Sequence, residues 1–153
     1  MGFNIVLIEP EILMTTGNIG RWCLASGSAL HLVKPFGFEL DDKRLKRAGL
    51  DYWKYISVNI YENIEDFFLK NKEANMVYFS SSATKNYTTI NFQDNMFFLF
   101  GKESVGLTKE IIGKNSENLY KIPIYSKHIR SLNLANAVSI VVYEALRNLK
   151  QFD

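Results

Sequence analysis

Short apolar runs alternate with amphipathic segments along the whole chain, and this alternation is the feature that most restricts the fold. Runs typical of strands occupy residues 3–8, 30–33, 56–60, 76–80, 96–100 and 119–124. Segments typical of helices lie between or after them, at residues 21–26, 41–49, 62–72, 108–114 and 132–149. Strands separated by helices indicate a parallel sheet with helices on both faces. We therefore predict an α/β fold, with a mostly parallel sheet in a single domain over residues 1–153.

The composition fits one globular domain and excludes several other classes. A chain of 153 residues, 47% of them hydrophobic, is long enough for one core. Its longest apolar runs fall far short of the roughly 20 residues that a membrane-spanning helix needs. The apolar start at residues 3–8 is followed by Glu9, Pro10 and Glu11 and by no small-residue cleavage site. We therefore expect a cytoplasmic protein without a membrane partner.

The single cysteine, Cys23, lies between Trp22 and Leu24 in an apolar stretch. It has no second cysteine for a disulfide and no histidine beside it in the sequence. We predict a buried, unreactive thiol, and we expect no metal site.

The loop at residues 101–107, GKESVGL, is the clearest candidate for a ligand site. In parallel sheets, ligands bind beyond the carboxyl ends of the strands, and this loop directly follows an apolar strand. Gly101 and Gly106 would let the backbone approach a ligand closely, and Glu103 would supply an acceptor or a structural hydrogen bond. The spacing matches neither a Walker A loop nor a dinucleotide fingerprint. An ordinary strand-to-helix turn is the alternative interpretation.

The start of the last helix carries two asparagines, Asn133 and Asn136, which share one helix face. Asparagine is unfavourable inside a helix, so the pair needs a reason. One hypothesis is helix capping with a buried hydrogen bond, and the other is closure of a pocket against the glycine loop. The rest of this helix is apolar on nearly all sides up to Glu144, which indicates a second subunit on its outer face.

The segment TGNIGR at residues 16–21 reads as a glycine-rich entry to a helix. Such an entry offers backbone N–H groups that suit a phosphate or hydroxyl oxygen. We predict that Arg21, one turn further on, reaches the same crevice. A plain surface arginine is the alternative.

A basic patch stands out on a chain whose net charge is only +2. Lys43, Arg44, Lys46 and Arg47 place four cations within five residues. A local patch on a nearly neutral body fits a partner with phosphates better than a membrane surface.

Five segments in order resemble the SPOUT superfamily of methyltransferases, and most closely its small tRNA-modifying YibK/TrmL branch. They are NIVLIEPEI (4–12), TGNIGRWC (16–23), DDKRLKRAGLDYW (41–53), LFGKESVGL (99–107) and IPIYSKHIRSLNLANAVSIVVYEALR (122–147). The resemblance implies methyl transfer from S-adenosylmethionine to a ribose 2'-hydroxyl of tRNA. The implied target is the wobble nucleotide at position 34, a cytidine or modified uridine, in leucine tRNAs. The resemblance also implies a C-terminal trefoil knot and a homodimer.

The resemblance also assigns site residues by position. It places the cofactor against Ser80, Gly101, Glu103, Gly106, Ile122, Ser131, Leu132 and Asn136. Arg21 would orient the ribose hydroxyl, and either Glu103 or His128 would accept its proton. Glu103 is also expected to brace the glycine loop, and Asn133 and Asn136 the knot. Residues 81–94 match poorly and receive no role.

For RNA, cations would neutralise phosphates, and an aromatic ring could stack on an unpaired base. The predicted RNA-binding residues are Lys43, Arg44, Lys46, Arg47, Lys127 and Arg130. Lys127 and Arg130, together with His128, are expected to form another edge of the same surface. The nearby aromatics Tyr52, Trp53 and Tyr55 belong either to this surface or to the core. Two rival functions stay open: the same chemistry on another tRNA or rRNA ribose, and a non-catalytic α/β ligand-binding module.

Overall fold

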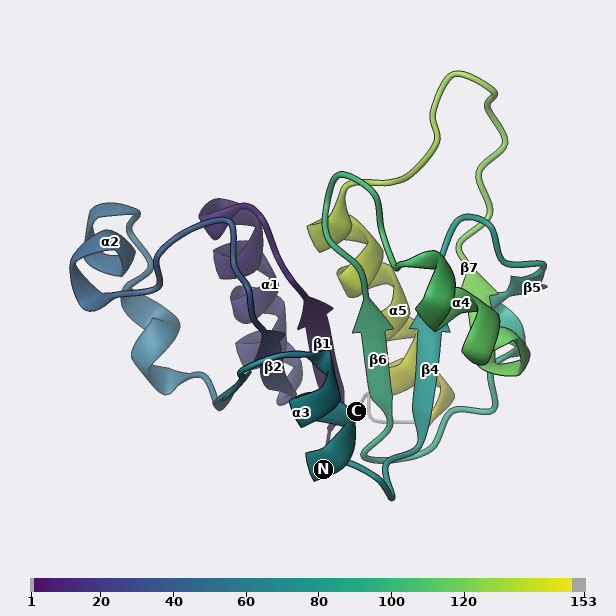
Figure 1. The fold of residues 1–153 in the computed structure, drawn as a ribbon, viewed down its shortest axis with the longest axis horizontal. Helices are drawn as coiled ribbons and strands as arrows, with labels where there is room; N and C mark the ends of the chain where they lie inside the picture. Colours follow the sequence, from purple (N-terminus) through teal and green to yellow (C-terminus); the bar gives the residue numbers. More distant parts are fainter. Residues whose placement is uncertain (1, 150–153) are drawn as a thin grey trace.

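Seven parallel strands form the centre of the molecule in a computed structural model that describes residues 2–149 (Figure 1). They are β1 (Asn4–Ile8), β2 (Ala29–Val33), β3 (Val58–Tyr61), β4 (Met76–Phe79), β5 (Lys85–Asn86), β6 (Phe97–Phe100) and β7 (Leu119–Lys121). Every neighbouring pair in the order β3-β2-β1-β6-β4-β7-β5 is parallel. This confirms the predicted α/β sheet. The predicted domain bounds include residues 1 and 150–153, which lie outside the described residues.

Helices cover both faces of the sheet. They are α1 (Leu13–Ser26), α2 (Asp42–Arg47), α3 (Ile64–Lys70), α4 (Lys109–Lys114) and α5 (Leu134–Asn148), with short 3₁₀ helices η1 (Asp51–Tyr55), η2 (Tyr87–Thr89) and η3 (Ser116–Asn118). Helices α1 and α5 pack on one face and α3 and α4 on the other (Figure 1). The Asp41 side chain caps the start of α2 by accepting a hydrogen bond from the Arg44 N–H.

The two cores explain why the central strands are apolar throughout. In β1, Ile5 and Leu7 pack with α1 and α5, whereas Val6 and Ile8 pack with α3 and α4. Side chains alternate between the faces of a strand, so a strand covered on both sides needs apolar residues at every position. Each such side chain contributes about 1.5–3 kcal/mol when it is fully buried.

Helix α1 starts earlier than predicted, and this corrects the expected glycine-rich entry loop. The helix begins at Leu13, so the predicted loop at 16–20 is helical, and the Thr16 N–H already bonds to the Ile12 carbonyl at 3.0 Å. Gly17 and Gly20 are sites of close packing: a Cβ on Gly17 would lie 2.6 Å from Leu50 Cδ1. The N–H groups expected to bind a phosphate or hydroxyl oxygen are therefore inside the helix.

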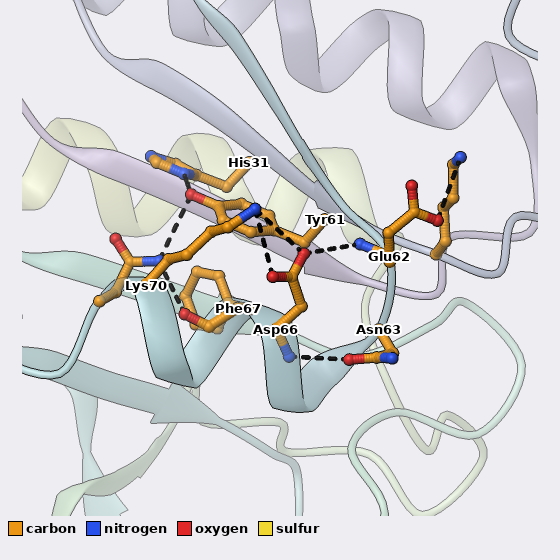
Figure 2. A network of polar contacts seen from close by, with 9 residues as sticks. His31, Tyr61, Glu62, Asn63, Asp66, Phe67 and Lys70 are labelled. Carbon is orange, nitrogen blue, oxygen red and sulfur yellow. Dashed lines mark hydrogen bonds and ion pairs between the residues drawn. The ribbon is translucent and has the colours of Figure 1, made fainter.

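A buried polar chain lies where β2 and β3 meet α3 (Figure 2). His31 Nδ1 is 2.8 Å from the Tyr61 hydroxyl, and His31 Nε2 is 2.9 Å from Asn4 Oδ1. An amide oxygen only accepts, so Nε2 carries the proton and Nδ1 accepts the Tyr61 O–H. The Tyr61 ring stacks on His31 and meets Phe67 edge-on. Burial lowers the pKa of His31 to about 4, and the ring is therefore neutral at pH 7.

This histidine makes stability depend on pH. We expect the free energy of unfolding to fall as the pH drops from about 6.5 to about 4, by up to about 3 kcal/mol from His31 alone. The folded ring has a pKa of about 4 and the unfolded ring its ordinary 6.5, so protons in this window bind the unfolded chain. Above pH 6.5 the contribution is complete.

Urea unfolding of the wild type and of His31→Gln between pH 4 and 7 measures this effect. The second histidine, His128, is exposed, and His128→Gln should keep the wild-type slope. An unchanged slope in His31→Gln would contradict the assignment.

Candidate functional site

A pocket of about 380 Å³ opens at the carboxyl ends of β4 and β6 and is also lined by the segment that follows β7. The pocket therefore lies at the edge of the sheet that was predicted to bind ligands. The walls of the pocket mix apolar side chains with backbone and hydroxyl groups. They come from Phe79, Ser80, Ser81, Phe100, Gly101, Lys102, Glu103, Ser104, Val105, Gly106, Ile122, Ile124, Arg130, Ser131, Leu132, Leu134 and Ala137. The volume lies in the range of small-molecule sites.

The glycine loop after β6 forms one wall, and its fold requires both glycines. The Gly106 N–H bonds to the Lys102 carbonyl at 2.9 Å, which folds the loop back on itself. A Cβ on Gly101 would lie 2.0 Å from the Gly106 carbonyl carbon. Gly106 has a φ of 72°, a left-handed conformation that side chains disfavour. The loop is therefore a tight strand-to-helix turn, and the same turn also lines a pocket. The two interpretations of this loop do not exclude each other.

Two carboxylates join this loop to the start of α1. Glu103 accepts hydrogen bonds from the Glu11 and Ile12 N–H groups, both at 2.9 Å. Glu11 returns the contact, because its Oε1 accepts from the Ser104 N–H at 2.8 Å. This bond holds the pKa of the Glu11 carboxyl below its ordinary value, with a smaller effect from Lys102. Ile12 is the N-cap of α1 and makes no side-chain cap, so Glu103 supplies that cap from elsewhere in the chain.

We expect Glu103→Ala to lower the free energy of unfolding by about 1–3 kcal/mol, because two N–H groups lose their acceptor. Glu103→Gln keeps one amide oxygen and should lose less. Urea unfolding of both variants measures the difference. Glu110→Ala is the matched control, since Glu110 pairs only with Lys114 on the exposed side of α4, and it should have little effect. If Glu103→Ala were as stable as this control, the bracing role would be refuted.

The opposite wall comes from the segment between β7 and α5. Strand β7 ends at Lys121, three residues before the predicted end, and irregular backbone follows. At the far end of this segment, Asn133 caps α5 by accepting the Asn136 N–H at 3.3 Å. The capping part of the first hypothesis therefore holds for Asn133, but the expected buried hydrogen bond does not, since this bond is exposed.

Most of the residues predicted to bind a cofactor meet in this pocket. Seven of them line it: Ser80, Gly101, Glu103, Gly106, Ile122, Ser131 and Leu132. Asn136 is the exception, because it is exposed in the first turn of α5 and does not line the pocket. Sequence reasoning missed Ser81, since residues 81–94 had no recognisable pattern, and also missed Lys102 and Ile124. The only signal for those two was their position inside motifs already singled out.

Arg21 lies outside the pocket, which corrects the expectation that it reaches the same crevice. It is exposed on α1 and is absent from the pocket lining. Its guanidinium lies over the Tyr52 ring, 5.6 Å from the centroid. The helix start at Leu13 explains the difference, because Arg21 is then two turns into α1.

The two basic segments lie on different parts of the molecule, so the predicted single surface is wrong within one chain. Figure 1 shows α2 at one end of the long axis and the loop between β7 and α5 projecting beyond the other half. In α2, Arg44 pairs with Glu39 at 2.9 Å and with Asp41. Lys127, His128 and Arg130 are exposed on the projecting loop, and Arg130 also lines the pocket.

The aromatics next to α2 divide between the two hypotheses. Tyr52 is half-buried, and Trp53 packs against α1, where its ring lies 3.0 Å from the position of a Cβ on Gly20. Tyr55 is 69% exposed. The core interpretation therefore holds for Trp53, which packs on the core cluster, whereas Tyr52 belongs to neither core cluster and Tyr55 is exposed.

Other reactive groups in the described part of the chain do not add to the site. Cys23 is fully buried, which confirms the predicted burial, and this burial raises the pKa of its thiol to about 12. Between residues 2 and 149, no cluster of three or more His, Cys, Asp or Glu could hold a metal ion. No helix in the same range is long and apolar enough to cross a membrane.

The sequence matches one family of known proteins, and its relatives carry names that agree with that family. Residues 2–143 match the SpoU rRNA Methylase family. A protein of Saccharophagus degradans, named tRNA (cytidine(34)-2'-O)-methyltransferase, is 44% identical over 148 residues, which cover 96% of this chain and 96% of that protein. A Geobacillus stearothermophilus protein whose name gives the same activity is 43% identical over 150 residues, covering 96% of this chain and 95% of its own.

Solved structures agree with the sequence relatives. A structure described as giving insights into the 2-OH methylation of C/U34 on tRNA has a TM-score of 0.90 and 36% identity. It covers 98% of this chain and 97% of its own. An AdoMet-bound rRNA methyltransferase from Sinorhizobium meliloti has a TM-score of 0.82 and 27% identity, and the match covers 97% of this chain and 57% of that one.

Proposed function

This chain belongs to the SpoU rRNA Methylase family, and on that premise we propose that it methylates the ribose 2'-hydroxyl of the wobble nucleotide of tRNA. The methyl donor is S-adenosylmethionine, and the target is the cytidine or modified uridine at position 34 of leucine tRNAs. The pocket at the ends of β4 and β6 is the observation that carries the proposal. The 44% identity to a relative named for this reaction supports the choice of substrate.

The pocket residues fit an adenosyl group. Its volume of about 380 Å³ and its apolar walls, which include Phe79, Phe100 and Leu134, suit a purine ring. The Gly101 turn and the segment at 122–132 line the same space, and their backbone N–H and C=O groups can pair with the edge of a base. Ser80 and Ser131 add hydroxyls.

The protein has two tasks in the reaction, because the sulfonium donor supplies an already activated methyl group. The chain must align the hydroxyl with that methyl group and help it lose its proton. A guanidinium donates hydrogen bonds and accepts none, so Arg21 serves to orient the hydroxyl or an adjacent phosphate and to stabilise the developing alkoxide. Both Glu103 oxygens already accept N–H groups, which favours bracing over proton transfer. His128 is the remaining candidate for the proton acceptor, and it lies on the exposed loop near Arg130, outside the pocket lining.

A homodimer completes this proposal. Helices α1 and α5 pack side by side, with Trp22 meeting Tyr143 edge-on, and they carry exposed Met14, Leu24 and Ile140. A second copy of the chain would cover these side chains. It would also let Arg21 of one copy serve the pocket of the other, which fits its position outside its own pocket. Sedimentation at micromolar concentration tests the dimer. The C-terminal knot and the cytoplasmic location remain parts of the same proposal.

The central experiment uses labelled S-adenosylmethionine and bulk tRNA from a strain that lacks the enzyme. The expected result is one labelled 2'-O-methylated nucleotide at position 34 of leucine tRNAs. Label at another tRNA position, or only in added ribosomal RNA, would keep the chemistry and refute the target. Calorimetry on the pure protein is the second arm. If it detects neither S-adenosylmethionine nor S-adenosylhomocysteine binding, the enzyme assignment fails.

The basic patch on α2 gives a separate prediction about tRNA binding. Arg47→Glu should weaken binding and reduce the slope of log affinity against log salt by about one. Arg44→Glu should do less, because Glu39 and Asp41 already neutralise that guanidinium. Filter binding at several salt concentrations measures both. Lys114→Glu on α4 controls for the change in net charge, and if it had the same effect as Arg47→Glu the patch would have no specific role.

A further inference from the structure

The short helix η1 is fixed to α1 by two close contacts at glycines. Leu50, just before η1, packs over Gly17, and Trp53 and Ile56 pack over Gly20. The atoms of Leu50 and Ile56 lie within 3.0 Å of where a Cβ on each glycine would be. Contacts this tight leave η1 little freedom to shift along α1. The backbone at Tyr52, between Leu50 and Trp53, is therefore held in place relative to α1.

Tyr52 reaches α1 with both of its functional parts. Its hydroxyl donates to the Gly17 carbonyl at 2.8 Å, one turn before Arg21. Its ring face lies below the Arg21 guanidinium, whose central carbon is 5.6 Å from the ring centroid. Partial burial raises the pKa of the Tyr52 phenol, with Arg21 acting in the opposite direction, so the hydroxyl remains a donor at neutral pH.

The ring holds the cation without neutralising it. An exposed arginine samples many rotamers, and fixing one costs conformational entropy. A carboxylate could fix it, but would also cancel the charge that a hydroxyl or phosphate needs. Among residues 2–149 no carboxylate forms an ion pair with Arg21, whereas Arg44 pairs with two carboxylates and Arg147 with one. An aromatic face restricts a guanidinium and leaves its N–H groups available.

We propose that Tyr52 is a positioning residue, which holds the Arg21 guanidinium in its working orientation through the face of its ring. The proposal rests on the catalytic role of Arg21 in the function proposed above. It gives the aromatic after the basic patch a task in catalysis and not in base stacking. Tyr52 itself touches no substrate.

Steady-state kinetics with tRNA and S-adenosylmethionine tests this with variants that lose the ring. Tyr52→Leu and Tyr52→Met should each lower kcat about tenfold, because the guanidinium loses its alignment. The KM for tRNA and the Kd for the cofactor should stay within about twofold. Tyr52→Phe keeps the ring face and should retain kcat within about threefold. In an Arg21→Lys background, Tyr52→Leu should have a smaller effect than in the wild type.

A second readout needs no turnover. In the protein without cofactor, the ring current of Tyr52 should shift the NMR signals of the Arg21 side chain. Tyr52→Leu should abolish that shift, and Tyr52→Phe should keep it. An Arg21 signal that is the same in all three proteins overturns the proposal.

The remaining outcomes are also distinct. If the wild type methylates no RNA, the proposed function fails, and the NMR result still decides the contact. If the wild type is active and Tyr52→Leu keeps its kcat, the positioning role is overturned. Equal losses in Tyr52→Phe and Tyr52→Leu would overturn it too, since the hydroxyl and not the ring would then matter. Parallel losses of cofactor affinity and thermal stability would point to a merely structural residue and also count against it.

Discussion

Arg21→Ala is expected to reduce the rate of methyl transfer by about 100- to 1000-fold while S-adenosylmethionine binding stays at the wild-type level. The size follows from the removal of a charge that stabilises a developing oxyanion. The separation follows from geometry, because Arg21 lies on α1 and does not line the pocket. Single-turnover methylation and calorimetry measure the two quantities on the same preparation.

Lys114→Ala is the control for Arg21→Ala. Lys114 is an exposed cation on α4 that pairs with Glu110 at 2.9 Å, and its removal should change neither quantity. Loss of cofactor binding together with turnover in Arg21→Ala would contradict the assigned role. Full activity of Arg21→Ala would show that the guanidinium is not needed for methyl transfer.

Gly101→Ala is expected to weaken cofactor binding at least about 100-fold and to lower the thermal stability. The added Cβ would lie 2.0 Å from the Gly106 carbonyl carbon and 2.2 Å from the Leu107 nitrogen, and both are backbone atoms that no rotamer change can move. The turn must open, which displaces the wall of the pocket. Calorimetry with S-adenosylhomocysteine and thermal unfolding measure the two effects.

Gly113→Ala is the matched control, because it makes the same substitution at a glycine in α4 where a Cβ would meet nothing within 4 Å. It should leave binding unchanged and be neutral or slightly stabilising, since alanine favours a helix over glycine by about 1 kcal/mol. Wild-type binding by Gly101→Ala would show that the loop does not shape the cofactor site.

The sequence was a good guide to the sheet because its central strands are covered on both faces. A short apolar run such as Phe97–Phe100 is typical of a strand buried on both faces. The start of α2 is also marked in the local sequence, because Asp41 is a residue type that favours the N-cap position. The short β5, with only Lys85 and Asn86, carries no apolar pattern, so nothing marked it as a strand.

The start of α1 could not be predicted, because what stabilises it lies elsewhere in the chain. Two glycines in eight residues argue against a helix on propensity alone. The compensation comes from Leu50, Trp53 and Ile56, which occupy the space that side chains at 17 and 20 would need. The cap comes from Glu103. The order of the strands is not written in any local pattern either, and that order separates Arg21 from the pocket.

The place of β1 in the sheet has a consequence for how the protein is made. Strand β1 pairs with β2, whose residues follow within about 30 positions, and with β6, which begins only at Phe97. During synthesis one side of this apolar strand therefore stays without its neighbour until β6 has left the ribosome. The start of α1 waits as long for the carboxylate that caps it, 91 residues away. The pocket wall formed by the glycine loop after β6 therefore takes shape only long after β1 and α1 have been synthesised.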